Sequence, residues 1–468
     1  MQRSYALSML PFLVLAACEI TVVEDKSDTG GTTDYADADT DTDTDADADA
    51  DTDADADADT DTDTGTPPMS LLDIAQGDPN LSLLVEAAVH AGLDDELDAP
   101  GSMTLFAPSN TAFEAAGLDS KTIAAYDAAA LADVLLYHVV DGSVDSASVP
   151  DRADSLATWT LFFDTTKGVM VNDATVTMPD VMADNGIAHV VDTVLMPPTI
   201  LDAAGYANLE GLVVAVGGAD PSVATMLSSE GDLTVMAPTD QAFADAVSLT
   251  KKMTPAELTE VLQYHVVEGS IESSALPEKA DSALLNGQSF GVSMVFDAKG
   301  ALVNGTAISD TDIRTTNGII HVVDGVLLPP NVVQMAELAG LTDYTATLAA
   351  ASGNLEQAFA DERFTFTLFG PDNQAFYDAA ATVSGLSPNA LQGVMNYHAS
   401  QAYFDSASMA QDDEIPTAFF PNSLTVDLSA GLTVEGAAVT LADLHSTNGV
   451  VHVIDTVLIP PTDTTTTN

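Results

Sequence analysis

Three blocks of sequence recur in the same order, about 130 residues apart, between residues 69 and 461. In each copy of the first block a short apolar run reaches a proline, and a Ser, Thr or Asp follows it. Proline cannot donate to a strand ladder, and these polar residues are favoured at helix N-termini. The block therefore predicts a strand that ends at the proline and a helix that begins directly after it. The copies span 104–113, 234–243 and 367–376, with Ser109, Thr239 and Asp372 as the expected caps.

The second block places a tyrosine and a histidine side by side at the end of an apolar segment with helical spacing. The pairs are Tyr137-His138, Tyr264-His265 and Tyr397-His398. A valine pair follows the first two pairs and indicates a strand, because β-branched residues favour strands. In the third copy Ala399-Ser400 takes that place, so module three departs from the pattern there.

The third block is an Asn-Gly dipeptide before a β-branched run that contains a histidine, and it closes on Pro-Pro. Asn-Gly in this setting predicts a β-hairpin. The closing proline pair is expected to end the strand and to mark a module boundary. The histidines of this block, on strands predicted to be buried, are expected to be satisfied core residues rather than ligands. They are His189, His321 and His452.

The three blocks together resemble the fasciclin (FAS1) family, over residues 69–461. The resemblance implies an α+β fold of three tandem modules, each a β-wedge of two small sheets with packed helices. It also implies extracellular adhesion and association with matrix or polysaccharide. The Pro-Pro pairs set the expected boundaries at 69–198, 199–330 and 331–461, and the tail 462–468 is expected to be disordered.

The N-terminus has the pattern of a processed lipoprotein. Arg3 precedes an apolar stretch that ends in Leu-Ala-Ala before Cys18, the one cysteine of the chain. The stretch is too short to span a bilayer, which needs about 20 apolar residues. We therefore expect residues 1–17 to be a signal peptide and Cys18 to carry the lipid. Without lipidation the chain would be secreted.

Residues 18–68 form an acidic linker in which every odd position from Asp37 to Asp63 is aspartate. Like charges repel one another in either a strand or a helix of this sequence, and no large apolar side chain offsets the chain entropy. We expect an extended, disordered spacer. Loose association with Ca²⁺ fits such a tract, whereas an EF-hand needs a glycine and a glutamate that are missing from its loop positions.

The formal charge of −61, from 72 acidic against 11 basic residues, argues against nucleic acid as a partner, since phosphate binding needs clustered cations. The histidines show no metal-site spacing, and neither H-E-x-x-H nor a P-loop occurs. We therefore expect no catalytic residues, no cofactor and no metal site, and a protein that is not an enzyme.

The Tyr-His pairs are the candidate binding residues, because the matching segment of the family is associated with adhesion. The alternative is a structural role for the pairs, because a histidine at a helix C-terminus interacts favourably with the helix dipole and a tyrosine ring packs into a core. The sequence predicts a lipid-anchored envelope or surface protein, outer-membrane in a bacterium, that binds extracellular protein or polysaccharide. The alternative is a small-ligand-binding protein or hydrolase that uses a cleft in one module.

Overall fold

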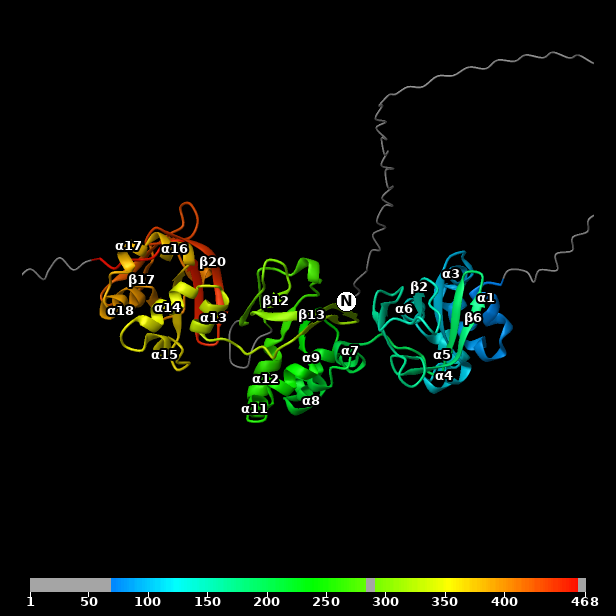
Figure 1. Ribbon diagram of the computed structural model, residues 1–468. Coiled ribbons are helices and arrows are strands. Elements are labelled where there is room, and N and C mark those ends of the chain that lie inside the picture. The colour runs from blue at the N-terminus through cyan, green and yellow to red at the C-terminus, as the bar shows by residue number, and fades with distance from the viewer. Residues whose placement is uncertain (1–68, 283–290, 462–468) are drawn as a thin grey trace, which may run out of the picture. The chain divides into compact units, whose positions relative to one another are not determined.

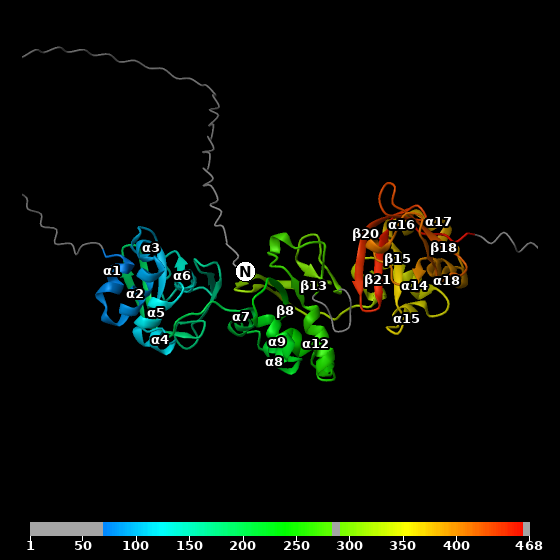
Figure 2. The ribbon, with the colours of Figure 1, turned by 180° about the vertical axis from the view of Figure 1, so that it is seen from behind.

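The computed structural model describes residues 69–282 and 291–461. Each repeat groups its helices before and after one strand and ends in a run of strands, so the chain has the expected α+β class. Figures 1 and 2 show strands and helices packed together in each repeat. We use module 1, module 2 and module 3 for residues 69–198, 199–330 and 331–461.

Module 1 opens with helices, continues with one strand and three more helices, and closes with strands. Its elements are α1 (Leu71–Gly77), η1 (Pro79–Leu81), α2 (Ser82–Ala91), α3 (Asp94–Asp98), β1 (Met103–Pro108), α4 (Asn110–Ala115), α5 (Ser120–Ala125), α6 (Ala128–Tyr137), β2 (Val139–Asp141), β3 (Arg152–Asp154), β4 (Thr160–Asp164), β5 (Met170–Val171), β6 (Ala174–Ala183) and β7 (Gly186–Val191).

Modules 2 and 3 repeat this order. Module 2 contains α7 (Ile200–Tyr206), α8 (Glu210–Gly218), α9 (Pro221–Ser228), β8 (Leu233–Pro238), α10 (Asp240–Asp245), α11 (Val247–Thr250), α12 (Pro255–Tyr264), β9 (Val266–Glu268), η2 (Ser273–Ala275), β10 (Lys279–Asp281), β11 (Ser293–Val295), β12 (Leu302–Val303), β13 (Thr306–Thr315) and β14 (Gly318–Val323). Module 3 contains α13 (Val332–Leu338), α14 (Thr342–Ala350), α15 (Leu355–Phe359), β15 (Phe366–Pro371), α16 (Asn373–Asp378), α17 (Ala380–Val383), α18 (Pro388–Tyr397), β16 (Ala399–Ser400), η3 (Ser406–Ser408), β17 (Glu414–Pro416), β18 (Ser423–Asp427), β19 (Thr433–Val434), β20 (Ala437–Ser446) and β21 (Gly449–Ile454).

The strands of module 1 are hydrogen-bonded in the order β2-β1-β7-β6-β5-β4-β3, and module 3 has the same order. Strands β1 and β7 run parallel, and the other pairs are antiparallel. The ten-residue β6 contains two register shifts against β7, and Asp180 within it has a left-handed φ of 58°. Such irregularities bend a strand. The two parts of the wedge are therefore joined through one long, irregular strand.

The first sequence block folds as predicted. Strands β1, β8 and β15 each end at the proline of the block, and a helix begins two residues later. The side chains of Ser109, Thr239 and Asp372 accept hydrogen bonds from main-chain N–H groups in the first turn, at 3.3, 3.1 and 2.7 Å. The capping prediction is confirmed in all three modules.

The Asn-Gly block forms the predicted hairpin between β6 and β7, in which Ala183 pairs with Gly186. Asn185 itself is buried, and its side chain holds three main-chain groups. It accepts from the N–H of Leu71 at 2.8 Å and donates to the carbonyls of Leu97 and Ala99 at 2.9 Å each. The asparagine thus joins the hairpin turn to the helices that open the module.

The expectation that the strand continues to the proline pair is wrong. Strand β7 ends at Val191, and the segment before Pro197 and Pro198 lies outside the ladder. The N–H of Leu195 in this segment donates to Nε2 of His138 at 2.9 Å. Beyond the strand, the main chain at Leu195 is therefore held by a side chain rather than by a neighbouring strand.

The expectations for the signal peptide, Cys18, the acidic linker and the tail concern residues outside the described ranges. Within residues 69–282 and 291–461 there is no helix that combines the length and the apolar character needed to cross a membrane.

Candidate functional site

All six residues of the Tyr-His pairs are buried, with at most 4% of each residue exposed. The tyrosine is the last residue of its helix and the histidine is the C-cap. Each pair lies in the interior of its own module. A binding partner therefore contacts only the surface segments that the pair holds in place, and not the pair itself. The pairs are Tyr137-His138, Tyr264-His265 and Tyr397-His398.

Both ring nitrogens of His138 are bonded to the main chain. Nδ1 donates to the carbonyl of Val134 at 2.8 Å, and Nε2 accepts from the N–H of Leu195 at 2.9 Å. This arrangement requires the neutral imidazole, and burial lowers the pKa of His138 to about 4. His265 and His398 make the same two contacts, and burial lowers the pKa of each to about 4.

The tyrosine hydroxyls anchor the other part of the module. Tyr137 donates to the carbonyl of Thr160 at 2.9 Å and accepts from Nδ2 of Asn172 at 2.8 Å. Tyr264 repeats this with Ser293 and Asn304, and burial raises the pKa of both phenols. Each pair therefore links a helix end to the strands on one side and to the pre-proline segment on the other.

The predicted core histidines are buried and bonded as expected. His189 is 1% exposed, its Nδ1 accepts from the N–H of Asp180 at 3.2 Å, and its Nε2 donates to the carbonyl of Val144 at 2.8 Å. His321 and His452 do the same in modules 2 and 3.

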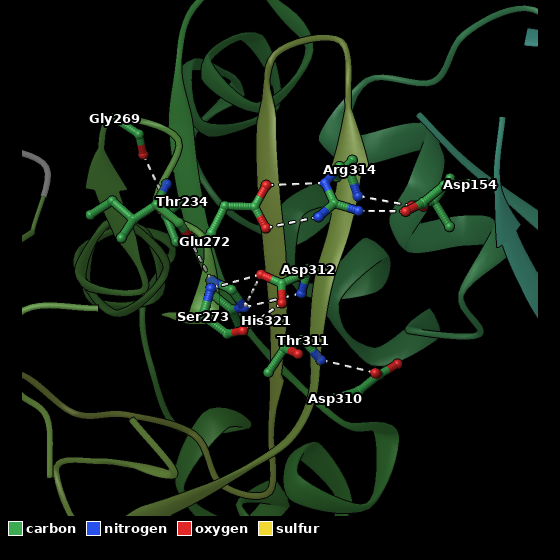
Figure 3. Close-up of polar contacts among 12 residues, drawn as sticks. Asp154, Thr234, Gly269, Glu272, Ser273, Asp310, Thr311, Asp312, Arg314 and His321 are labelled. Atoms are coloured by element: carbon green, nitrogen blue, oxygen red, sulfur yellow. Dashed lines mark hydrogen bonds and ion pairs between the residues drawn. The ribbon is translucent and has the colours of Figure 1, made fainter. Parts of the chain in front are cut away.

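The sequence prediction missed a serine and an aspartate that accompany these histidines. Figure 3 shows the set in module 2, where the Ser273 hydroxyl donates to Asp312 beside His321. Partial burial acts to raise the pKa of Asp312, but the hydrogen bonds from the Ser273 hydroxyl and N–H outweigh it, so the pKa lies below its ordinary value. A catalytic triad needs the hydroxyl to donate to the imidazole. Here the hydroxyl donates to the carboxylate, and the imidazole bonds to the main chain, so the set fixes the loop before η2 to the irregular part of β13. The recurrence of aspartate in the long strand, at Asp180, Asp312 and Asp443, was the available signal.

One match to a hydrolase motif was also not predicted. Gly287 to Gly291 reads Gly-Gln-Ser-Phe-Gly, which fits the G-x-S-x-G pattern of hydrolases. That pattern functions on a turn between a strand and a helix. The match lies between β10 and β11, and residues 283–290 lie outside the described ranges. Because a strand follows the match, its context is not the one that the hydrolase pattern requires.

Consecutive modules contact one another through the same strands. Arg152 of β3 pairs with Asp310 of β13 at 2.6 Å. Arg314 pairs with Asp154 of β3 in module 1 and with Glu272 of its own module (Figure 3). The Phe162 ring, 8% exposed, packs into the apolar cluster of module 2. These ionic side chains are 33% to 48% exposed, so each pair contributes about 1 kcal/mol or less.

The contact recurs between modules 2 and 3. Lys279 of β10 donates to the carbonyl of Asp443 at 2.7 Å. The Ser293 hydroxyl accepts from the N–H of His445 at 2.9 Å. The equivalent bond between modules 1 and 2 joins the Thr160 hydroxyl to the N–H of Arg314 at 3.0 Å. Three of the 11 basic residues are used in these contacts.

Among the described residues, no group of three or more His, Cys, Asp or Glu side chains is placed to hold a metal ion.

Comparison with known proteins places this geometry in a family. The family model described as "Fasciclin domain" matches residues 79–197, 212–329 and 339–460, which together make up more than half of the chain. Transforming growth factor-beta-induced protein ig-h3 of Oryctolagus cuniculus is 26% identical over 406 residues, covering 80% of this chain and 55% of that protein. The chain thus spans little more than half the length of this relative.

A bacterial relative and a solved structure complete the comparison. Cell surface glycolipoprotein MPB83 of Mycobacterium bovis is 34% identical over 134 residues, covering 26% of this chain and 59% of that protein. A FAS1 domain pair from the insect cell adhesion molecule fasciclin I covers 54% of this chain and 97% of the solved one, with 16% identity and a TM-score of 0.32. The assignment rests on the three matched ranges: this chain belongs to the fasciclin domain family.

Proposed function

We propose that this chain is a non-catalytic surface protein that mediates adhesion by binding matrix, polysaccharide or protein through its three fasciclin modules. The main support for the proposal is that one module occurs three times in the chain. When one weak site is bound, the other sites are held near the same surface at a high effective concentration, so the chain stays bound longer. The relative named a cell surface glycolipoprotein supports a position at the cell surface.

The anchor is part of the proposal. Lipidation of Cys18 would hold the protein at the envelope, on the outer membrane or cell surface of a bacterium, and the acidic linker would separate the modules from the lipid. A chain without the lipid would be secreted. The linker also offers loose Ca²⁺ association, whereas the net charge of −61 disfavours nucleic acid.

The partner surface must come from exposed side chains, because the Tyr-His pairs are buried. Two aromatic side chains of module 3 are more than three-quarters exposed, Tyr377 at 77% and Phe420 at 90%. Aromatic residues are enriched in protein interfaces. In this proposal the exposed aromatics contact the partner, and the Tyr-His pairs hold the framework beneath the binding surface.

Adhesion of beads coated with residues 69–461 tests these roles on matrix, glycan and cell surfaces, with and without Ca²⁺. Retention should fall with Tyr377→Ala and Phe420→Ala, which change exposed side chains of a folded module. Tyr137→Phe keeps the buried ring and serves as the control, since it should not alter retention while the module stays folded. Full retention in both exposed variants would contradict a role of these aromatics.

The contribution of repetition is tested by coating beads at equal density with residues 69–461 or with residues 331–461, since both keep Tyr377 and Phe420. The three-module chain should be retained longer at the same surface. Equal retention would contradict the avidity argument.

The alternative function is small-ligand binding or hydrolysis in one module. The contacts of the Ser-Asp-His sets do not support a nucleophile, whereas an apolar cavity in module 1 favours ligand binding. Ligand binding is therefore the better supported form of this alternative.

A further inference from the structure

Module 1 contains an apolar cavity of about 220 Å³ between its opening helices and the strands β1 and β2. Its inner wall consists of buried aliphatic side chains, each at most 7% exposed: Leu84, Ala88, Leu97, Leu105, Leu135 and Val139. Leu156, which is 46% exposed, and the exposed Glu96 also line the cavity, so it communicates with the surface.

The third module carries larger side chains at the matching positions. Helices α2 and α14 each begin directly after a buried leucine, Leu81 or Leu341, so Leu84 corresponds to Tyr344 and Ala88 to Leu348. The fold of module 3 thus accommodates more side-chain volume where module 1 has a cavity.

Two further positions show the same difference. Leu97 and Phe359 correspond, because the carbonyl of each accepts a hydrogen bond from the hairpin asparagine of its module. Met103 and Phe366 correspond, because each pairs with the first glycine of the parallel strand. The rings of Phe359 and Phe366 lie 5.1 Å apart. Module 1 has aliphatic side chains at both positions, so the space that these rings occupy in module 3 is left to a ligand in module 1.

The size and lining of the cavity define the ligand class. An apolar cavity of about 150 Å³ binds benzene and stays free of water. The cavity of module 1 is larger, so it can take a small aromatic molecule or the end of an aliphatic chain, which gains by leaving water.

The charge at the opening selects the polar end of the ligand. Glu96 lines the cavity and belongs to α3, whose sequence Asp-Asp-Glu-Leu-Asp carries four carboxylates, and none of the lining residues is basic. An anionic head group would be repelled there. We propose that module 1 binds the apolar tail of a small neutral or cationic amphiphile, independently of any adhesive function.

Three six-carbon probes test this proposal: hexan-1-ol, hexylammonium and hexanoate. The readout is the methyl resonance of Met103, a lining residue, in the methyl-labelled full-length chain. Hexan-1-ol and hexylammonium should shift it saturably, and hexanoate should bind about two- to fivefold more weakly than hexylammonium. The preference for hexylammonium over hexanoate should decrease at about 1 M salt, because the Debye length is then only about 3 Å.

Filling the cavity provides the decisive variants. Leu97→Phe and Ala88→Leu introduce the side chains that module 3 carries at these positions, and each should weaken binding at least about tenfold while the chain stays folded. The second variant serves if the first fails to fold. Leu227→Phe makes the matching change in module 2 and should leave the Met103 response unchanged. The proposal is overturned if no probe shifts Met103 saturably, if hexanoate binds as well as hexylammonium, or if folded, filled variants bind like the wild type.

Discussion

The buried His138 makes the stability of module 1 depend on pH between neutrality and pH 4. Its pKa is about 4 in the folded module, against 6.5 for an ordinary histidine, because burial penalises the charged ring. Between pH 6.5 and pH 4 the unfolded chain therefore binds more protons than the folded chain. The stability that depends on the neutral His138 is fully present above pH 6.5 and is lost progressively as the pH falls through 4. The complete loss corresponds to about 3 kcal/mol, and about 2 kcal/mol of it is gone at pH 5.

Trp159 allows this to be measured in the whole chain, because it is the one tryptophan and its ring lies 6.3 Å from the ring of Tyr137. Urea unfolding followed by Trp159 fluorescence thus reports module 1, although His265 and His398 titrate in the other modules. We expect the free energy of unfolding to fall by about 2 kcal/mol from pH 7 to pH 5. Carboxylates with lowered pKa values, such as Asp180, titrate below this range and do not interfere.

His138→Gln is the matched variant, since glutamine has a donor and an acceptor but does not titrate. It should be less stable than the wild type at pH 7 and should lose most of the change between pH 7 and pH 5. Equal unfolding free energies of the wild type at the two pH values would refute the reasoning. An undiminished change in His138→Gln would refute the assignment to His138.

Three further predictions concern other parts of the chain. Asn185→Ala removes three hydrogen bonds of a buried side chain and should lower the stability of module 1 by about 2–3 kcal/mol in the Trp159 assay; an effect below about 0.5 kcal/mol would contradict this. Gly186→Ala places a Cβ 2.0 Å from the carbonyl oxygen of Met103 and should prevent the parallel pairing of β1 and β7, whereas Gly101→Ala, which meets nothing within 4 Å, should fold normally by circular dichroism. Cys18→Ser should move the protein from the membrane fraction to the soluble fraction of expressing cells, and unchanged membrane association would argue against the lipid anchor.

Features with local causes could be predicted from the sequence. The strand that stops at Pro108 and the cap at Ser109 depend on neighbours within a few residues, and the structure confirms both. The hairpin at Asn185 followed in the same way from an Asn-Gly pair and β-branched residues.

Features that depend on distant residues could not be predicted. The sequence offers both an adhesive and a structural role for the Tyr-His pair, and it does not show which distant groups, Thr160, Asn172 and Leu195, bond its polar atoms. No local pattern indicates the path of the segment after Val191, since Leu195 is bonded to His138, more than fifty residues earlier in the chain. The cavity depends on helices and strands that meet only in the fold.

Binding of the three modules to an extracellular surface can be measured as the retention of coated beads. Beads coated with residues 69–461 would be exposed to matrix proteins, glycans and cells under flow, with albumin-coated beads as the reference. We expect saturable retention on at least one surface, and soluble chain should compete for it. The absence of retention above the albumin reference on every surface, with and without Ca²⁺, would rule out adhesion through these modules.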